Sequence, residues 1–151
     1  MKKRTNEGNT LTQLILEIFQ INGELLAAGN KITKPFGLTS ARWQIMGAID
    51  LAEQPLTVAQ IARRMGLTRQ GVQRIVNDLK QLDMVELLDN RDHKRAPLIA
   101  ITAAGAIVMA KVDQAQINWV NQLSCNLNER TIHQALNLLE KVRGRLEQNN
   151  D

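Results

Sequence analysis

The segment TVAQIARRMGLTRQGV, from Thr57 to Val72, constrains the fold most, because it has the composition and spacing of two short helices joined by a tight turn. Ala62 is small enough to let two helices approach closely, and Gly66 can adopt the positive φ that the turn between them usually requires. Val72 offers an apolar contact that would hold the second helix on the first. The segment therefore predicts a helix-turn-helix, with an ordinary hairpin of two helices as the alternative.

Residues with side-chain oxygens stand where helices are expected to begin. Thr57 and Gln60 have the spacing of a capping box at the start of the first helix, and Thr68 is a suitable N-cap for the second. The same reasoning gives N-caps for three further helices, at Thr39, Thr102 and Asn128.

The hydrophobic periodicity predicts the other elements. Helical spacing of apolar residues predicts helices over about residues 10–30, 40–53, 57–82 (the helix-turn-helix), 103–124 and from 129 onward. In the runs MVELLDN and APLIAIT the period changes from about 3.6 to about 2, and the basic stretch RDHKR separates them. This pattern predicts a β-hairpin with a protruding basic tip, which directly behind a helix-turn-helix is called a wing.

The positive charge is concentrated in the middle of the chain. The whole chain of 151 residues has a formal net charge of +4 and 44% hydrophobic residues. Between Leu56 and Thr102, eight lysines and arginines stand against five aspartates and glutamates, an excess of three. A local basic patch favours a polyanion partner, and a solvated basic face without a partner is the alternative.

The fold class expected from this order is mainly α with a small β-hairpin wing: a winged helix-turn-helix core plus long terminal helices. The terminal helices carry apolar stripes, and a small winged core offers little surface to cover them. Identical helices of a second copy are the simplest cover, so we expect a homodimer. A monomer whose terminal helices fold back on the core is the alternative.

The expected domains follow from this organisation. They are an N-terminal dimerisation helix (1–36), a winged helix-turn-helix DNA-binding domain (37–102) and C-terminal dimerisation helices (103–151). No apolar run approaches the roughly 20 residues that a membrane span needs, and the N-terminus has no secretion signal. With a single cysteine, these features predict a cytoplasmic protein without a membrane partner.

The chain resembles the MarR family of winged helix-turn-helix transcriptional regulators. Three segments carry the resemblance: LTSARWQIM from Leu38 to Met46, the helix-turn-helix with QGVQRIVNDL, and the hairpin ending in LIAITAAG. The resemblance implies a homodimer that binds a pseudo-palindromic operator in double-stranded DNA. It also implies release by a small aromatic or anionic compound, or by an oxidant, as in many relatives.

The second helix of the helix-turn-helix supplies the expected major-groove contacts. Arginine can bind guanine with two hydrogen bonds, and glutamine can bind adenine, so Arg69, Gln70 and Gln73 are predicted to contact base edges. Arg74 and Thr68 are predicted to contact phosphates, which position the helix without reading sequence. The alternative for each of them is a solvated helix surface.

The tip of the wing supplies the expected minor-groove contact. Arg91, His93, Lys94 and Arg95 form this tip, and Arg95 is predicted to insert into a narrow A·T-rich minor groove, with Lys94 and Arg91 on the backbone. Many relatives have an aspartate two residues before the wing arginine, and here His93 occupies that place, with Asp92 one residue earlier. Arg95 is therefore expected to be held differently. Purely electrostatic docking of the wing is the alternative.

An effector pocket is predicted beside Arg42, Trp43 and Met46, because ligands of the family often bind between the terminal helices and the core. Trp43 and Met46 could instead be ordinary core residues. Arg42 is expected to pair with an anionic ligand or with a carboxylate of the dimer helices. Cys125, beside Leu123 and Leu127, is expected to be a small buried apolar residue rather than an oxidation sensor.

An enzyme and a winged module without operator specificity are the two other function classes. The two histidines are far apart in sequence, and no motif combines a nucleophile with a base or a set of metal ligands, so no enzyme, catalytic residue, metal or cofactor is expected. A winged module for protein contact or DNA architecture, without operator specificity, remains the alternative. The sequence thus predicts a dimeric, ligand-responsive transcriptional regulator, more specifically a repressor.

Overall fold

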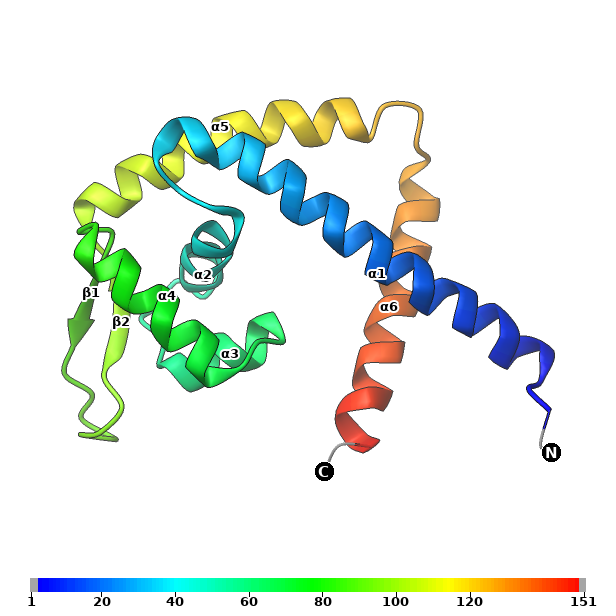
Figure 1. The fold of residues 1–151 in the computed structure, drawn as a ribbon, viewed down its shortest axis with the longest axis horizontal. Coiled ribbons are helices and arrows are strands. Elements are labelled where there is room, and N and C mark those ends of the chain that lie inside the picture. The colour runs from blue at the N-terminus through cyan, green and yellow to red at the C-terminus, as the bar shows by residue number, and fades with distance from the viewer. Residues whose placement is uncertain (1–2, 150–151) are drawn as a thin grey trace. The chain divides into compact units, whose positions relative to one another are not determined.

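The computed structural model describes residues 3–149, which form helices and one two-stranded antiparallel sheet (Figure 1). The elements are α1 (Asn6–Thr33), η1 (Lys34–Phe36), α2 (Ser40–Asp50), α3 (Val58–Met65), α4 (Arg69–Gln81), β1 (Val85–Leu88), β2 (Leu98–Ile101), α5 (Ala103–Leu123) and α6 (Glu129–Asn149). The expected fold class, mainly α with a small β-hairpin wing, is confirmed.

The chain divides into two compact units, with the boundary between Ala115 and Gln116, inside α5. The first unit holds α1, the winged helix-turn-helix and the start of α5. The second unit holds the end of α5 and all of α6. The expected division after residues 36 and 102 is one of function, and it stays a prediction.

Helix α1 is longer than its apolar stripe indicated, because a polar residue caps it ahead of the stripe. The Thr5 hydroxyl accepts a hydrogen bond from the Gly8 backbone N–H (3.1 Å), so the helix begins at Asn6 rather than near residue 10. At the other end, Pro35 lies in the short 3-10 helix η1, and Gly37 follows with a φ of 72°. These two residues separate α1 from α2, as the sequence predicted.

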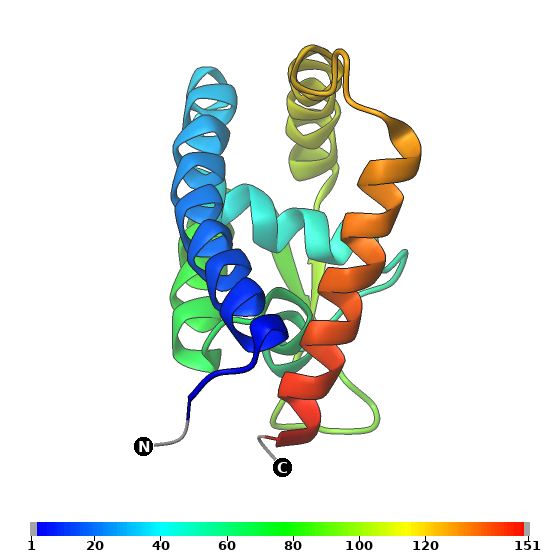
Figure 2. The same cartoon turned by 90° about the vertical axis from the view of Figure 1, so that its right-hand side faces the viewer.

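Helix α2 is attached to the C-terminal part of α1 and runs across the first unit (Figure 2). The Asn30 carboxamide oxygen of α1 accepts a hydrogen bond from the Ser40 backbone N–H (2.8 Å), which satisfies a free donor at the start of α2. Gly29 allows this approach, since a Cβ at that position would lie 3.0 Å from the Cβ of Ser40. The helix junction is therefore close-packed as well as hydrogen-bonded.

The helix-turn-helix has the local geometry that its sequence predicted. Thr57 and Gln60 form the reciprocal capping box at the start of α3. Gly66 has a φ of 63° in the turn, and the Thr68 hydroxyl accepts a hydrogen bond from the Gly71 N–H (3.1 Å) at the start of α4. These bonds fix where α4 begins, and with it the orientation of its first turns.

The hydrophobic core lies among α2, α3, α4, the hairpin and the start of α5. Ala62 and Val72 are buried in it, as the helix-turn-helix requires. Its largest fully buried side chains are Ile45, Met46, Leu56, Ile61, Leu79, Ile99, Val72, Val76 and Val112. Helix α4 and the hairpin therefore pack on one common hydrophobic core.

The hairpin is anchored to the segment before α3. β1 and β2 pair in antiparallel register, and Leu88 opposite Leu98 is the last pair before the loop. Leu56 adds an isolated bridge to Ile99 through two backbone hydrogen bonds, of 3.1 and 2.8 Å. β2 is thus paired on both sides, and this stabilises the base of the wing against the helix-turn-helix.

The hairpin is also joined closely to α5. The Thr102 hydroxyl donates a hydrogen bond to the Asp83 carbonyl (2.6 Å), and it accepts one from the Gly105 N–H (2.9 Å) as the N-cap of α5. A Cβ at Gly105 would overlap the backbone carbonyl of Met84. Glycine is therefore required where α5 passes the start of β1.

The terminal helices carry large exposed apolar side chains. α1 exposes Phe19 (68%) and α6 exposes Leu136 (50%), and none of the described residues of α6 is buried. The other examples on these two helices are Leu11, Ile15, Leu16, Ile21, Leu25, Ile132, Leu138, Leu139 and Leu146. In the part of the chain that the structure covers, no helix is both long and apolar enough to cross a membrane.

Cys125 corrects an expectation, because its side chain is exposed rather than buried. It follows the end of α5, in the turn that precedes the Asn128 cap of α6. A residue in such a turn has few neighbours from other elements, so apolar neighbours in sequence were a poor guide to its burial.

Candidate nucleic-acid interface

Helix α4 has one buried apolar face and one exposed polar face. Val72, Val76 and Leu79 are buried on the first. All five predicted major-groove and phosphate contacts are exposed: Thr68, Arg69, Gln70, Gln73 and Arg74. The helical period of about 3.6 residues separates the two sets, so the buried anchors direct the polar set towards solvent.

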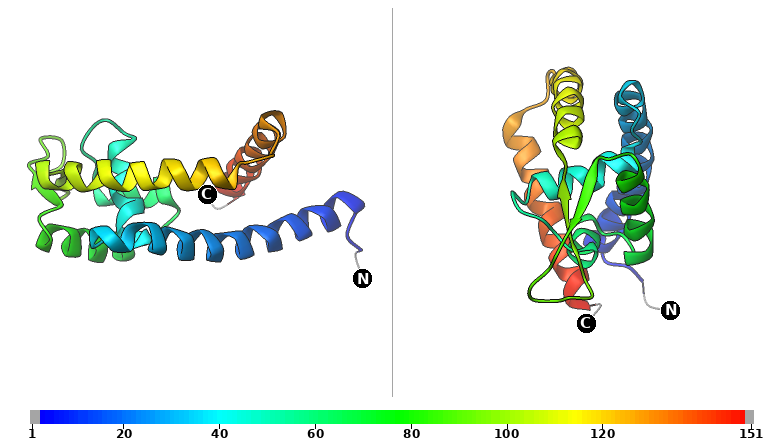
Figure 3. Two further views of the ribbon diagram at one scale, coloured as in Figure 1. Left: turned by 90° about the horizontal axis from the view of Figure 1, so that it is seen from above. Right: turned by 90° about the vertical axis from the view of Figure 1, so that its left-hand side faces the viewer.

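The first turns of α4 and the end of the wing loop line one concave surface of about 350 Å³. Three segments contribute to it: Thr57, Val58 and Ala59; Arg69, Gln70 and Gln73; and Arg95, Ala96 and Pro97. The hairpin loop lies on the same side of the winged core as the N-terminal end of α4 (Figures 1 and 3). The three residues predicted for base edges and the arginine predicted for the minor groove are thereby brought together.

The other predicted contacts lie outside this concave lining. Thr68, the N-cap of α4, and Arg74 on α4 are exposed, as are Arg91, His93 and Lys94 in the wing loop. Thr68 is engaged through its hydroxyl as the N-cap of α4. An exposed position is what a phosphate contact needs, and it equally fits a solvated surface, so their roles stay predictions.

Asn77 is a polar residue of α4 that the sequence reasoning did not single out. The Gln73 side-chain amide donates a hydrogen bond to the Asn77 carboxamide oxygen (2.9 Å). The spacing of four residues on an exposed helix face is the signal that could have found this pair. This bond uses one of the two hydrogens of the Gln73 N–H₂ group, so its other hydrogen and its carbonyl oxygen remain available to a further partner.

The wing loop is organised by Asn90, another residue that the sequence reasoning missed. Its carboxamide oxygen accepts hydrogen bonds from the backbone N–H groups of Asp92 (3.1 Å) and His93 (3.3 Å). Its amide nitrogen donates to the Ala96 carbonyl (2.8 Å) across the loop. Asparagine followed by a polar loop is a common signal for such a turn.

Arg95 has no carboxylate partner among the described residues. Within residues 3–149, its guanidinium forms no ion pair with Asp92 or any other acidic side chain. Asp92 contributes its backbone N–H to the Asn90 network instead. How the Arg95 side chain is held on DNA stays a prediction.

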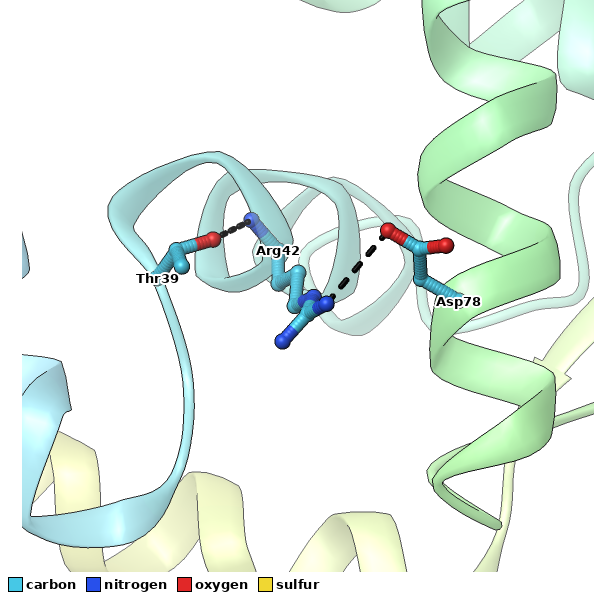
Figure 4. A network of polar contacts seen from close by, with 3 residues as sticks. All are labelled: Thr39, Arg42 and Asp78. Atoms are coloured by element: carbon cyan, nitrogen blue, oxygen red, sulfur yellow. Dashed lines mark hydrogen bonds and ion pairs between the residues drawn. The ribbon is translucent and has the colours of Figure 1, made fainter.

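Arg42 has a partner that the sequence reasoning did not name. Its guanidinium lies 3.4 Å from the carboxylate of Asp78 on α4 (Figure 4), and the expected pairing with an anionic ligand or with a carboxylate of dimer helices stays a prediction. The Thr39 hydroxyl caps α2 by accepting a hydrogen bond from the Arg42 backbone N–H (3.3 Å). The sequence could not reveal this pair, because the two residues are 36 positions apart.

The other two residues of the predicted effector pocket differ in burial. Met46 is fully buried in the core, so it offers no surface to a ligand. Trp43 is half-buried and packs against the core. The alternative of an ordinary core residue therefore holds for Met46, and a pocket beside Arg42 and Trp43 stays a prediction.

The fold and the polar face of α4 beside a basic hairpin loop define a winged helix-turn-helix protein. Residues 36–96 match the sequence pattern of the MarR family. An uncharacterised protein of Mycobacterium tuberculosis is 37% identical over 114 residues, which cover 76% of this chain and 78% of the relative. The chain belongs to the MarR family, a family of transcription regulators.

Solved structures share the whole fold. A MarR/EmrR family transcriptional regulator from Acinetobacter sp. ADP1 superposes with a TM-score of 0.82 at 23% identity, covering 91% of this chain and 96% of the other. A mutant MarR from E. coli in complex with operator DNA has a TM-score of 0.77 at 22% identity, with coverages of 91% and 99%. At sequence identities this low, the similarity to these two structures shows a shared fold and nothing more.

Proposed function

We propose that the protein is a dimeric, sequence-specific DNA-binding regulator that represses transcription from a pseudo-palindromic operator. The observation that carries this proposal is the concave surface shared by Arg69, Gln70 and Gln73 of α4 and Arg95 of the wing. An exposed helix face with arginine and glutamine fits the major groove, where both side chains can distinguish base edges. The operator-bound family member with the same fold supports this placement.

Helix α4 and the wing contact different grooves of the DNA. Arg69, Gln70 and Gln73 contact base edges in the major groove, and Arg74 and Thr68 contact the flanking phosphates. Arg95 enters the adjacent minor groove. Arg91 and Lys94 lie on the backbone around it, where they add affinity that depends on salt rather than on sequence, and His93 completes the tip of the wing.

The exposed apolar residues of α1 and α6 support a homodimer. Exposure of apolar side chains such as Phe19 and Leu136 to water is unfavourable. A second copy of the chain, related by two-fold symmetry, can cover them with the same apolar faces. A two-fold dimer presents two α4 helices to DNA. They read a pseudo-palindrome when they lie about one helical turn apart, roughly 34 Å.

A small aromatic or anionic effector that binds beside Arg42 and Trp43 releases the operator. Arg42 already holds a carboxylate, that of Asp78 on α4, so an anionic ligand competes for a contact that reaches the DNA-binding helix. If the effector binds the conformation that does not bind DNA more tightly by a few kcal/mol, this is enough to release the protein from the operator. In this proposal the protein binds DNA and the effector but catalyses no reaction, and it acts in the cytoplasm.

The experiment that tests the proposal is a selection from random duplex DNA, followed by titration of the selected site at two salt concentrations. We expect an enriched inverted repeat whose half-sites are about one helical turn apart, bound about 10³-fold or more above random DNA. Size measurement of the complex should give two chains on one site. Absence of enrichment, with binding that only collapses as salt rises, would contradict the proposal and favour an architectural module.

A further inference from the structure

The wing loop is closed by one side chain that uses both ends of its amide. Asn90 accepts two hydrogen bonds, from the N–H groups of Asp92 and His93, and donates one to the Ala96 carbonyl. The Ala96 N–H in turn donates to the His93 carbonyl (2.9 Å). These four bonds join the start of the loop to its end.

Arg95 lies inside the segment that this network closes, between His93 and Ala96. The loop outside the network is exposed, and residues 91–95 have no strand partner of their own. Without Asn90, an exposed loop of this kind samples many conformations, and binding DNA then has to order it. With Asn90, the backbone is hydrogen-bonded on both sides of Arg95, at His93 and at Ala96.

We propose that Asn90 is a positioning residue that presets the wing loop and so places Arg95 for the minor groove. The inference rests on the proposed DNA-binding function and deepens it. Asn90 acts on the loop backbone rather than on the guanidinium of Arg95.

The chemistry of the site selects asparagine over its closest analogues. The oxygen faces two N–H donors and the nitrogen faces a carbonyl acceptor, so the opposite orientation of the amide would lose all three bonds. Aspartate keeps the two acceptor contacts but has no donor for the Ala96 carbonyl. Alanine keeps none, so the two substitutions separate the two halves of the network.

The first test needs no DNA. The loop contains Arg91, Lys94 and Arg95, which are sites for trypsin, so limited proteolysis of the full chain reports how often the loop opens. We expect Asn90→Ala to raise the cleavage rate in the loop about tenfold and Asn90→Asp to raise it less. The melting temperature should stay within about 2 °C.

The matched control for the loop is Asp89→Ala. Asp89 is the neighbouring exposed residue, and its side chain takes no part in the Asn90 network among the described residues. It should leave the cleavage rate unchanged. If Asn90→Ala is cleaved at the wild-type rate, Asn90 does not order the loop and the inference is wrong.

The second test connects Asn90 to Arg95 on the selected operator, through a cycle of Asn90→Ala, Arg95→Ala and the double variant. Asn90→Ala should weaken binding about fivefold when Arg95 is present and leave it almost unchanged when Arg95 is alanine. Equal weakening in both backgrounds would overturn the inference, because Asn90 would then act independently of Arg95. If no operator is selected, the proposed function fails, and the cleavage test still decides the role of Asn90 in the loop.

Discussion

The guanidinium of Arg42 on α2 lies 3.4 Å from the carboxylate of Asp78 on α4, and this ion pair joins the body of the core to the helix proposed to read DNA (Figure 4). Both side chains are partly exposed, Arg42 by 28% and Asp78 by 43%. Water and salt therefore screen the attraction, and its contribution to the free energy of unfolding is about 0.2–1 kcal/mol.

A double-mutant cycle on Arg42 and Asp78 should confirm this small value. Arg42→Ala, Asp78→Ala and the double variant should give a coupling of about 0.2–1 kcal/mol in urea unfolding at fixed protein concentration. The coupling should shrink in 1 M salt, where the Debye length falls to about 3 Å. A coupling above about 2 kcal/mol, unchanged by salt, would contradict a partly exposed pair.

Arg95→Ala should weaken binding to the selected operator about tenfold or more at moderate salt. The reason is that a guanidinium in a narrow minor groove meets a concentrated negative potential. The loss should be smaller on a site whose A·T-rich flank is replaced by G·C, measured by fluorescence anisotropy. Lys94→Ala is the control: it should lower the affinity for all sequences alike and reduce the salt slope. Unchanged affinity for Arg95→Ala would rule out insertion.

Arg69→Ala should cost about 1–3 kcal/mol of binding free energy and relax the preference for one base pair, because a bidentate contact to a base edge is lost. The measurement is a titration against the operator and its single-base variants. Arg74→Ala should instead reduce the salt slope by about one without changing the base preference. Lys80→Ala, at the exposed C-terminal end of the same helix, should change neither. If Arg74→Ala relaxes the base preference, Arg74 rather than Arg69 contacts the base edge, and the assignment is wrong.

Gly105→Ala should destabilise the protein although alanine favours helices. The added Cβ would overlap the Met84 carbonyl, which belongs to backbone and cannot rotate away. Gly47→Ala is the matched control in α2, where a Cβ meets nothing within 4 Å, and it should stabilise by about 0.5–1 kcal/mol. Thermal or urea unfolding should give opposite signs for the two variants. A stabilised Gly105→Ala would contradict the close approach of α5 to β1.

Asp113→Asn should stabilise the protein at neutral pH and lose this effect in acid. Burial raises the pKa of the Asp113 carboxyl above its usual value of 3.8, and repulsion from Asp50 raises it further. A raised carboxyl pKa means that stability falls as the pH rises from the unfolded value through the folded one, so the penalty is complete above that window. Unfolding of both proteins between pH 3 and pH 7 measures it. A stability difference that does not vary with pH would contradict this cause.

The sequence alone determined the features that depend on a few neighbouring residues. The capping box of Thr57 and Gln60, the left-handed turn at Gly66 and the cap at Thr68 all follow from local backbone chemistry, and the structure confirms them. The change of hydrophobic period likewise predicted the hairpin, because alternation is a property of the strand itself.

Only the tertiary structure decided how distant side chains meet. The partner of Arg42, the exposure of Cys125, the burial of Met46 and the loop network around Asn90 depend on the path of the backbone in space. Hydrogen bonds and ion pairs act within about 3–4 Å. Sequence periodicity reports which face of an element is buried, but it does not report which polar group from another element arrives within that distance, and packing of the complete core decides that.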